Sequence, residues 1–320
     1  ENEIIISSGP IGGITQYSGT GKSLVVSLSP QTGSVMDSNV GGFFGPFLKF
    51  SGFDALEIQG KSESDVIVFI DGINHTVEIF DAPEESTDSH LLAEQLTDMF
   101  AENDNEKKQI GIVSTGCAAE HSLIGMLNFS FYDPKRKKVR LKQAGRGGIG
   151  TVFRNKKIKA LVCKIPGVKG NLNNVVDLDA IMERGRRFNR EMRELDDKQC
   201  QMRQTGTAHL MEIMNDHDLL PVMNYKYGSH KDAFRIDSSV WKRNFTQNVP
   251  DGCWIGCNMS CTKGIDDYIV QSGPYKGQKV IVDGPEYENA AGLGANCGIF
   301  DPGYVIETNF YCDTYGICTI

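Results

Sequence analysis

The stretch DSNVGGFFGPFLKFSGFD, residues 37–54, joins a glycine pair to a dense run of aromatic residues. Glycine lets the backbone approach a ligand closely and adopt positive φ, so that consecutive N–H groups can face an anion. Two further loops share this character, GPIGG at residues 9–13 and AGRGGIGTVFRNKKIKA at residues 144–160. Any one of them alone is most simply a tight turn. Because Lys22 and Arg146 lie near two of the loops, the three together predict a cradle for a phosphorylated cofactor.

The sequence around this stretch is rich in strands. Short β-branched runs separated by Gly, Pro, Asp and Asn are typical of strands joined by turns. These runs are EIIIS (3–7), SLVVSLS (23–29), ALEIQG (55–60), VIVFIDG (66–72), HTVEIF (75–80), KQIGIVST (108–115) and KALVCKI (159–165). A hairpin is predicted to turn at Asp71 to Asn74. One amphipathic helix is predicted over residues 89–103, after a cap at Ser86 or Thr87.

The pattern changes near residues 168–172. Residues 176–199 and 207–220 have apolar side chains at helical spacing, and residues 289–298 and 302–317 predict loop and helix. We therefore predict an α+β protein with a strand-rich domain over residues 1–169 and a mainly helical domain over residues 170–320. The chain opens within a strand without Met and stops within a patterned segment. We expect it to be part of a longer polypeptide.

Composition excludes several classes of protein. The 320 residues are 40% hydrophobic and 23% charged, which is ordinary for a globular protein, and the formal net charge of -8 argues against nucleic-acid binding. No apolar run is long enough to cross a bilayer and no signal peptide is evident, so we expect cytoplasmic residence. Nine cysteines, three of them in one loop, indicate a reduced compartment and one metal site rather than a disulfide framework.

The segment SGTGKS, residues 18–23, looks like the end of a nucleotide-binding P-loop. That motif needs a glycine where this chain has Gln16, and it must open a helix, whereas residues 24–30 alternate like a strand. The sequence therefore argues against an ATP or GTP site. Lys22 is left either as a solvated turn residue or as a contact to another phosphate.

Three cysteines recur at a spacing of four residues in the segment DGCWIGCNMSCTKG. Cys253, Cys257 and Cys261 can present thiolates to one iron–sulfur cluster, with a fourth ligand from elsewhere. Zinc is the second choice, because zinc knuckles usually close with paired two-residue spacings and a second half-site. Three cysteines packed as small apolar residues are the third choice.

Two glutamates flank a tyrosine in DGPEYENAAGLGANCG, residues 283–298. A carboxylate among small apolar residues can be desolvated, which raises its pKa toward that of a useful general acid or base. From the residues alone, a solvated loop carboxylate is the simpler interpretation of both Glu286 and Glu288.

The order of these blocks closely resembles that of the aldehyde:ferredoxin oxidoreductases, tungsten enzymes with a bis-pyranopterin cofactor. The matching blocks are GP, SPQTG, DSNVGGFFGPFLKFSGFDALEIQGK, GRGGIGTVFRNKKIKALV, the cysteine cluster, GPEYE and CDTYGIC. The resemblance runs from residue 1 to residue 320 and implies a two-sheet, cofactor-binding N-terminal domain. Family members begin some tens of residues earlier and continue through a further helical domain.

The resemblance also implies roles for individual residues. Those that fall on the family's contacts to the pterins, their phosphates and a bridging Mg²⁺ are Lys22, Asn39, Gly41, Arg146, Gly147, Gly148, Asp313 and Cys318. Lys22 stands in the place of an arginine, and Asp313 opens DTYGIC, which matches the pterin motif D-x-x-G-L-(C/D). Glu288 falls at the carboxylate beside the metal. Cys253, Cys257 and Cys261 fall on three ligands of a 4Fe-4S cluster.

Three departures from the family pattern matter. The first two cysteines are separated by three residues instead of two, which makes Cys253 the least secure ligand. Cys318 occupies a position that is usually Asp in this copy of the motif, and we interpret it as a buried thiol near the pterin. The fourth cluster ligand, the second pterin motif and an active-site histidine are expected beyond residue 320.

The function implied is oxidation of aldehydes to carboxylic acids, or the reverse, at tungsten or molybdenum, with Glu288 as proton acceptor. Electrons would pass through the 4Fe-4S cluster to ferredoxin or to a small iron–sulfur subunit, in a homodimer or a hetero-oligomer. Two alternatives stay open. One is the tungsten subunit of a benzoyl-coenzyme A reductase-like complex, and the other is a non-catalytic iron–sulfur electron-transfer protein.

Overall fold

The computed structural model describes residues 2–83, 88–168, 173–247, 249 and 251–319. They form two compact units, each built from separate parts of the chain. The N-terminal unit comprises Glu1–Arg187, Cys253–Cys257 and Asp313–Cys318, and the second unit comprises the remaining residues. The domain boundary placed from the sequence, after residue 169, lies outside the described residues.

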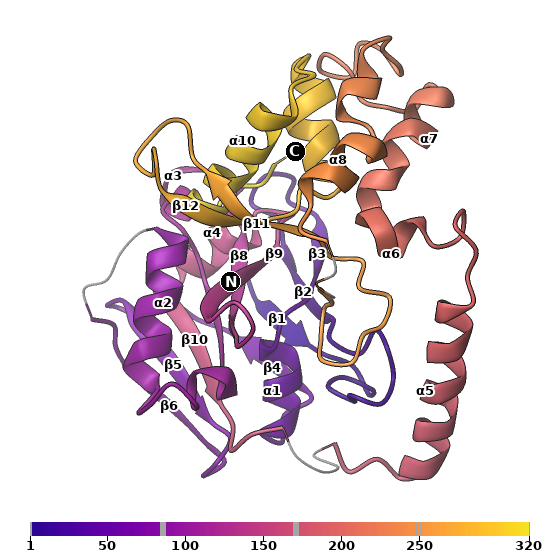
Figure 1. The fold of residues 1–320 in the computed structure, drawn as a ribbon. Helices are drawn as coiled ribbons and strands as arrows, with labels where there is room; N and C mark the ends of the chain where they lie inside the picture. Colours follow the sequence, from indigo (N-terminus) through magenta and orange to yellow (C-terminus); the bar gives the residue numbers. More distant parts are fainter. Residues whose placement is uncertain (1, 84–87, 169–172, 248, 250, 320) are drawn as a thin grey trace. The chain divides into compact units, whose positions relative to one another are not determined.

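A four-stranded antiparallel sheet forms one part of the N-terminal unit (Figure 1). Its order is β3 (Val35–Val40), β2 (Ser23–Leu28), β1 (Ile4–Ser7) and β4 (Ala55–Ile58). Side chains alternate across the sheet, so that Ile4, Ile6 and Val25 are fully buried while Ile5 and Leu24 are exposed. The strand β2 directly after Lys22 confirms that SGTGKS does not open a helix.

A six-stranded mixed sheet forms the other part. Its order is β6 (Thr76–Asp81), β5 (Val66–Asp71), β10 (Ile158–Lys164), β7 (Ile110–Ser114), β8 (Leu127–Asp133) and β9 (Lys138–Ala144). Only the β5–β10 pair is parallel. The predicted hairpin is confirmed, because Asp71 pairs with Thr76 and its carboxylate accepts hydrogen bonds from the N–H groups of Ile73 and Asn74.

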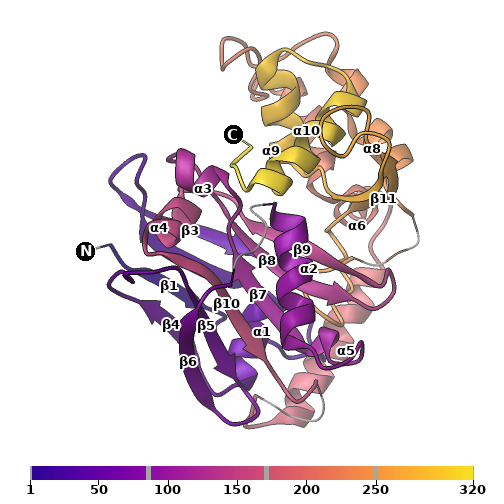
Figure 2. The ribbon, with the colours of Figure 1, turned by 90° about the vertical axis from the view of Figure 1, so that its left-hand side faces the viewer.

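All seven strands predicted for this unit are present, and three more strands, β3, β8 and β9, were missed. The predicted helix is α2 (Ser89–Phe100), which lies along the six-stranded sheet in Figure 2. Its cap is Asp88, whose side chain accepts from His90 and Leu91 N–H groups. The predicted caps Ser86 and Thr87 lie outside the described residues. The unit also contains α1 (Phe44–Phe50), η1 (Lys107–Gln109), α3 (Ala118–His121) and α4 (Ile149–Asn155).

The core of the N-terminal unit is strongly aromatic. Phe44 and Phe47 of α1, Phe129 of β8 and Phe153 of α4 are fully buried, and they belong to one cluster that includes both sheets. The aromatic run noted in residues 37–54 therefore supplies one helix of this core. The aromatic run begins directly after the glycine pair Gly41-Gly42, so the glycine loop is connected to a closely packed helix.

The second unit is mainly helical, as predicted. It contains α6 (Gln201–Thr205), α7 (Leu210–Asp216), α8 (Ser238–Asn244), α9 (Tyr287–Asn289) and short segments η2 (Gly206–His209), η3 (Ala233–Ile236), η4 (Ala290–Gly294) and η5 (Ala295–Cys297). Helices α5 (Leu178–Arg193) and α10 (Pro302–Tyr315) extend into both units. An antiparallel hairpin, β11 (Gly264–Ile269) and β12 (Lys279–Asp283), was not predicted. The α+β class is confirmed.

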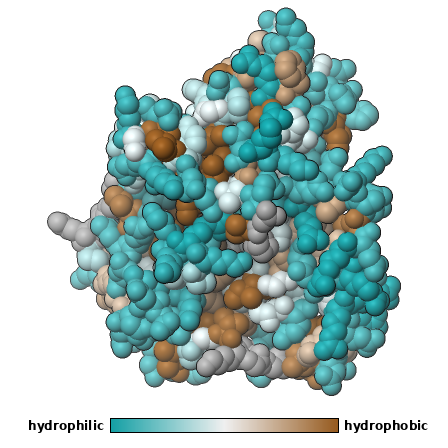
Figure 3. Space-filling model, viewed as in Figure 1, coloured by the Kyte–Doolittle hydropathy of each residue, from teal (hydrophilic) through white to brown (hydrophobic). Residues whose placement is uncertain are grey.

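The face shown in Figure 3 is largely polar, most clearly over α5 at the lower right, and small brown apolar groups lie between the polar side chains. Within the described ranges, no helix combines the length and apolar character needed to cross a membrane.

Candidate functional site

Three of the residues predicted to contact phosphate, Lys22, Asn39 and Gly41, lie at one end of the β2–β3 pair. Ser23 pairs with Val40 and Leu24 with Asn39, which places Lys22 and Gly41 just beyond the paired residues at the same end. The side chains of Lys22 and Asn39 are both exposed. Asn39 donates a weak hydrogen bond of 3.5 Å to Asp37. A cation and an amide donor are thus presented together.

The loop Arg146–Gly148 lies beside β3. The backbone N–H of Arg146 donates to Ser38 Oγ at 3.4 Å, and a Cβ on Gly147 would lie 2.9 Å from Met36 Cβ. Gly147 and Gly148 have φ of 77° and 66°, and a side chain on Gly148 would overlap the carbonyl oxygen of Leu123. Both positions therefore require glycine, for conformation and for space. Arg146 itself is exposed.

The motif Asp313–Cys318 joins the same region from the far end of the chain. The N–H of Met126 donates to Gly316 O at 2.9 Å, and the N–H of Cys318 donates to Ile124 O at 3.0 Å. Since Leu123 abuts Gly148, the segment 123–126 contacts both the loop Arg146–Gly148 and this motif. Asp313 is buried and Cys318 half-buried.

Two of the three cluster cysteines are brought together in the N-terminal unit. The Cys253 thiol is hydrogen-bonded to Cys257, which together with burial raises the pKa of the Cys253 thiol. The N–H of Gly21 and the charge of Lys22 act in the opposite direction, toward the thiolate. The N–H of Gly42 donates to Cys253 O at 3.0 Å. Cys253, the least secure ligand by spacing, is thus held in the N-terminal unit by contacts with Gly21, Gly42 and Cys257.

Cys261 belongs to the second unit, where it is half-buried. Gly206 approaches it so closely that a Cβ there would lie 2.5 Å from Cys261 O. In the ranges that the structure covers, no three His, Cys, Asp or Glu side chains form a metal-binding group. A cluster that includes Cys261 therefore stays a prediction.

The two glutamates of the GPEYE block, also in the second unit, have different surroundings. Glu286 caps α9, accepts a hydrogen bond from Thr207 Oγ1, and its N–H donates to Asn289 Oδ1 at 3.0 Å. Glu288 is exposed on α9. Burial, followed by the charge of Glu288, raises the pKa of Tyr287 between them. Glu286 therefore has a structural role, and Glu288 is the carboxylate left available for chemistry.

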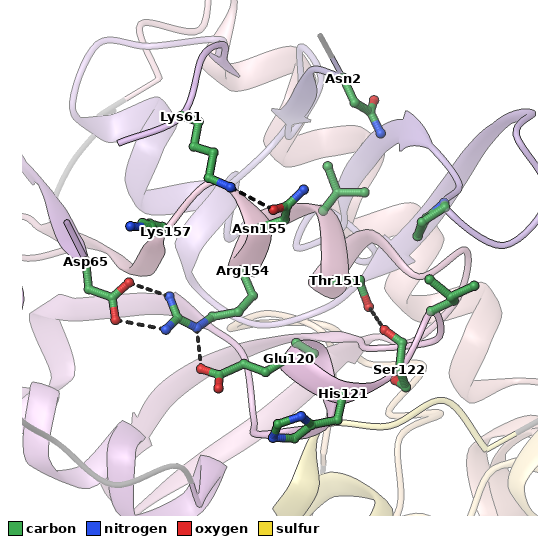
Figure 4. Close-up of a pocket in the computed structure, with 14 residues that line it drawn as sticks. Asn2, Lys61, Asp65, Glu120, His121, Ser122, Thr151, Arg154, Asn155 and Lys157 are labelled. Atoms are coloured by element: carbon green, nitrogen blue, oxygen red, sulfur yellow. Dashed lines mark hydrogen bonds and ion pairs between the residues drawn. The ribbon is translucent and has the colours of Figure 1, made fainter. Parts of the chain in front are cut away.

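A cavity of about 680 Å³ in the N-terminal unit is lined by none of the predicted cofactor-binding, metal-binding or catalytic residues. Figure 4 shows Arg154 between Asp65 and Glu120, with hydrogen bonds of 2.7 and 2.8 Å to Asp65 and 2.6 Å to Glu120. These pairs satisfy the guanidinium, so the lining is a structural ion-pair network.

Sequence reasoning also missed Trp254, Ser38 and the contact role of Gly21. Trp254 lies between two predicted ligands, and its indole donates to Gly13 O at 3.1 Å, in the first glycine loop. The available signal was a large aromatic residue inside a cysteine spacing, but its partners are distant in sequence.

Comparison with known proteins identifies the family. The model "Aldehyde ferredoxin oxidoreductase, N-terminal domain" matches residues 1–165, and "Aldehyde ferredoxin oxidoreductase, domains 2 & 3" matches residues 183–320. Tungsten-containing aldehyde ferredoxin oxidoreductases from Pyrococcus horikoshii and Thermococcus kodakarensis are 32% and 33% identical to this chain over its full length. The "Aliphatic sulfonate oxidoreductase, WOR-like subunit" of Pyrococcus furiosus is 28% identical over 99% of the chain.

These matches cover about half of each relative, 48% of its length. A solved chain of the active-site complex BamBC of benzoyl coenzyme A reductase, in complex with 1,5-dienoyl-CoA, shares the fold. Its TM-score is 0.67 at 18% identity, over 99% of this chain and 45% of that one. The matches to both family models span nearly all of the sequence, and the chain belongs to the aldehyde ferredoxin oxidoreductase family.

Proposed function

We propose that the protein containing this chain is a tungsten-dependent oxidoreductase that interconverts aldehydes and carboxylates and passes electrons through a 4Fe-4S cluster to ferredoxin. The observation that carries this proposal is that exposed Lys22 and Asn39 lie near one end of the β2–β3 pair, while the backbone of exposed Arg146 contacts Ser38 of β3. Gly147 and Gly148 follow Arg146 at positions that require glycine. Membership of a family whose relatives include tungsten enzymes supports it.

The residues present fit a phosphorylated pterin. Lys22 and Arg146 supply positive charge and Asn39 supplies an exposed amide, and Gly41, Gly147 and Gly148 lie in the same loops, where they would face phosphate oxygens and a bridging Mg²⁺. Asp313 and Cys318 would contribute to the pterin itself from the docked motif. When bound, the metal–pterin group would supply the two-electron redox chemistry, with tungsten favoured over molybdenum.

The chain's own residues would accept a proton from the substrate and bind the cluster that carries the electrons away. Oxidation of an aldehyde to a carboxylate takes up one water oxygen and releases two electrons and three protons. Glu288, exposed on α9, is the group proposed to accept a proton from the substrate. Cys253 and Cys257, already adjacent, would bind the cluster with Cys261 and a fourth ligand expected beyond residue 320. Ferredoxin, or a small iron–sulfur subunit, would receive the electrons one at a time.

Elemental analysis of natively purified full-length protein tests the proposal. We expect tungsten together with about four iron atoms per cluster site. A substrate survey with a viologen acceptor should then show activity on aliphatic or aromatic aldehydes. Iron without tungsten or molybdenum would instead indicate a non-catalytic electron carrier, and activity restricted to aryl thioesters would indicate a benzoyl-coenzyme A reductase-like subunit.

Lys22→Ala tests the phosphate site. Because Lys22 is an exposed cation beside Asn39 and Gly41, its loss should lower the tungsten content by several-fold, whereas iron per chain should not change. Lys22→Arg, which offers a bidentate fork to phosphate, should keep full tungsten content. Metal content is measured by mass spectrometry on the purified variants. Full tungsten content in Lys22→Ala would make Lys22 a solvated turn residue.

A further inference from the structure

Trp254 anchors the turn Cys253–Cys257 to the N-terminal unit. Its side chain is 4% exposed, and its indole N–H donates to Gly13 O at 3.1 Å. The ring lies edge-on to Phe43 and Phe47, with centroid distances of 4.7 and 5.9 Å. Trp254 and Phe47 belong to the core cluster of the unit and Phe43 packs against it, so the indole forms part of the aromatic core.

Glycines close around this turn from the strand ends. A Cβ on Gly21 would overlap Trp254 Cβ, and one on Gly41 would lie 3.1 Å from Cys253 Cβ. The N–H of Gly42 holds Cys253 O at 3.0 Å. Gly21 directly precedes Lys22, and Gly41 is itself one of the residues proposed to bind cofactor phosphates. The cysteine turn and the phosphate loops therefore share backbone contacts.

The three-residue spacing between the cysteines has a structural explanation. The N–H of Cys257 donates to Trp254 O at 3.3 Å, which closes a turn, and Gly256 in its third position has a φ of 83°. Ser18 Oγ, in the segment SGTGKS, donates a hydrogen bond to Gly256 O at 3.3 Å. The turn brings the Cys253 and Cys257 thiols together although one residue more separates them than in the archetypal family pattern.

We propose that Trp254 is a positioning residue for the iron–sulfur cluster, whose indole fixes the Cys253–Cys257 turn so that both thiols are in place before iron arrives. The inference rests on the proposed function for the identity of the metal group. Its physical basis is preorganisation: a glycine-containing turn that is anchored at one buried side chain loses less conformational freedom when it binds the cluster. Trp254 would not touch the cluster and would act through its two neighbours.

The second tryptophan provides a matched control. Trp241 is fully buried in the second unit, its indole N–H donates to Ile236 O at 2.8 Å, and its ring packs against Phe245. Trp254→Phe and Trp241→Phe therefore each remove one buried indole-to-carbonyl hydrogen bond and keep an aromatic ring. A general loss of stability should affect the two variants similarly, whereas a positioning role is confined to Trp254.

The experiment uses full-length protein produced without tungsten, so that only the cluster is observed. The measurements are the rate at which a ferrous chelator removes iron under argon, and the electron paramagnetic resonance spectrum of the dithionite-reduced cluster. We expect Trp254→Phe to release iron about fivefold faster, as for the loss of one hydrogen bond, and to change the spectrum. Trp254→Ala should release iron faster still. Trp241→Phe should match the wild type in both measurements.

Two negative outcomes are distinguishable. Equal iron release and identical spectra in Trp254→Phe and Trp241→Phe would overturn the positioning role and leave the proposed function intact. Wild-type protein that retains no iron after anaerobic purification and reconstitution would instead overturn the cluster, and with it the proposed function.

Discussion

Three segments of the N-terminal unit converge on one residue, Arg154 of α4. Its guanidinium makes a two-pronged contact with Asp65, before β5, and a third hydrogen bond to Glu120 of α3. The hydrogen bond from Arg154 is the main cause that lowers the pKa of Asp65, and the same bond raises the pKa of Arg154. A planar fork is needed for this geometry, which an ammonium cannot reproduce.

We predict that Arg154→Lys lowers the free energy of unfolding by about 1 kcal/mol at pH 7, a value kept small because solvent screens the partly exposed Asp65. The folded-state pKa of Asp65 lies below its ordinary value, so the pair contributes fully above about pH 4 and less as the pH falls through the folded value. Urea unfolding at several pH values measures this. A difference between variant and wild type that does not shrink below pH 4 would contradict the assignment.

Residues with local causes were predictable from the sequence, and those with distant partners were not. Gly147 and Gly148 stood out because two adjacent glycines after a cation already suggest positive φ, and both have it. Trp254 gave no such signal, since its hydrogen-bond partner, Gly13, is 241 positions away. The residues alone did not separate Glu286 from Glu288, and the structure separates them because Thr207 and Asn289 contact the first of them.

At the scale of elements, the segment Asp313–Cys318 depends on Gly316. Its φ is 72°, and a Cβ there would lie 2.6 Å from the backbone N of Gly116. Gly316→Ala should therefore combine backbone strain with a collision against main chain that cannot move away. The strain alone costs on the order of 1–2 kcal/mol, and the collision adds to it.

Gly33→Ala is the control for that prediction. Gly33 has a similar φ of 70° in the turn between β2 and β3, but nothing lies within 4 Å of its Cβ position. We expect Gly33→Ala to show only the backbone strain, so Gly316→Ala should be the more destabilised variant in thermal unfolding. Gly316→Ala should also lose tungsten, because the pterin motif would no longer dock on Ile124 and Met126. Equal melting temperatures for both variants would contradict the close packing.

Strands were predictable from the sequence where the pattern of apolar side chains alone indicates a strand. All seven β-branched runs are strands, but β3, β8 and β9 were missed because they bury polar side chains such as Ser38, Asn128 and Lys142. The side-chain N–H of Asn128 donates to Ser89 Oγ at the start of α2, a contact that the local sequence does not indicate. Pairing with neighbouring strands overrides the weak propensity of these segments.

For the whole molecule, the units are not continuous in sequence. Cys253–Cys257 and Asp313–Cys318 complete the N-terminal unit although they lie far beyond residue 187. A single domain boundary predicted from the sequence gives two continuous domains, so it cannot describe a unit made of three separate segments. The two inserted segments carry predicted cluster ligands and the pterin motif, so the unit expected to bind the cofactor is assembled from three parts of the chain.

This arrangement predicts that the continuous fragment 1–187 will not fold to the stability it has in the full chain. Without Trp254, the aromatic site formed by Phe43, Phe47 and Phe50 is open, at a cost of about 3–5 kcal/mol by analogy with removal of a buried tryptophan side chain. Without Gly316 and Cys318, Met126 N–H and Ile124 O lose their backbone partners.

The fragment should unfold at a lower urea concentration than the full chain, with a broader transition, and should bind a dye that reports exposed apolar surface. Full-length Trp254→Ala should show part of the same loss, because it opens the aromatic site but keeps the docked pterin motif. A fragment that binds no dye and unfolds cooperatively at the same urea concentration as the full chain would mean that the N-terminal unit folds without the two inserted segments. The expected result would make completion of the N-terminal unit, and thus cofactor binding, depend on synthesis of the chain through residue 318.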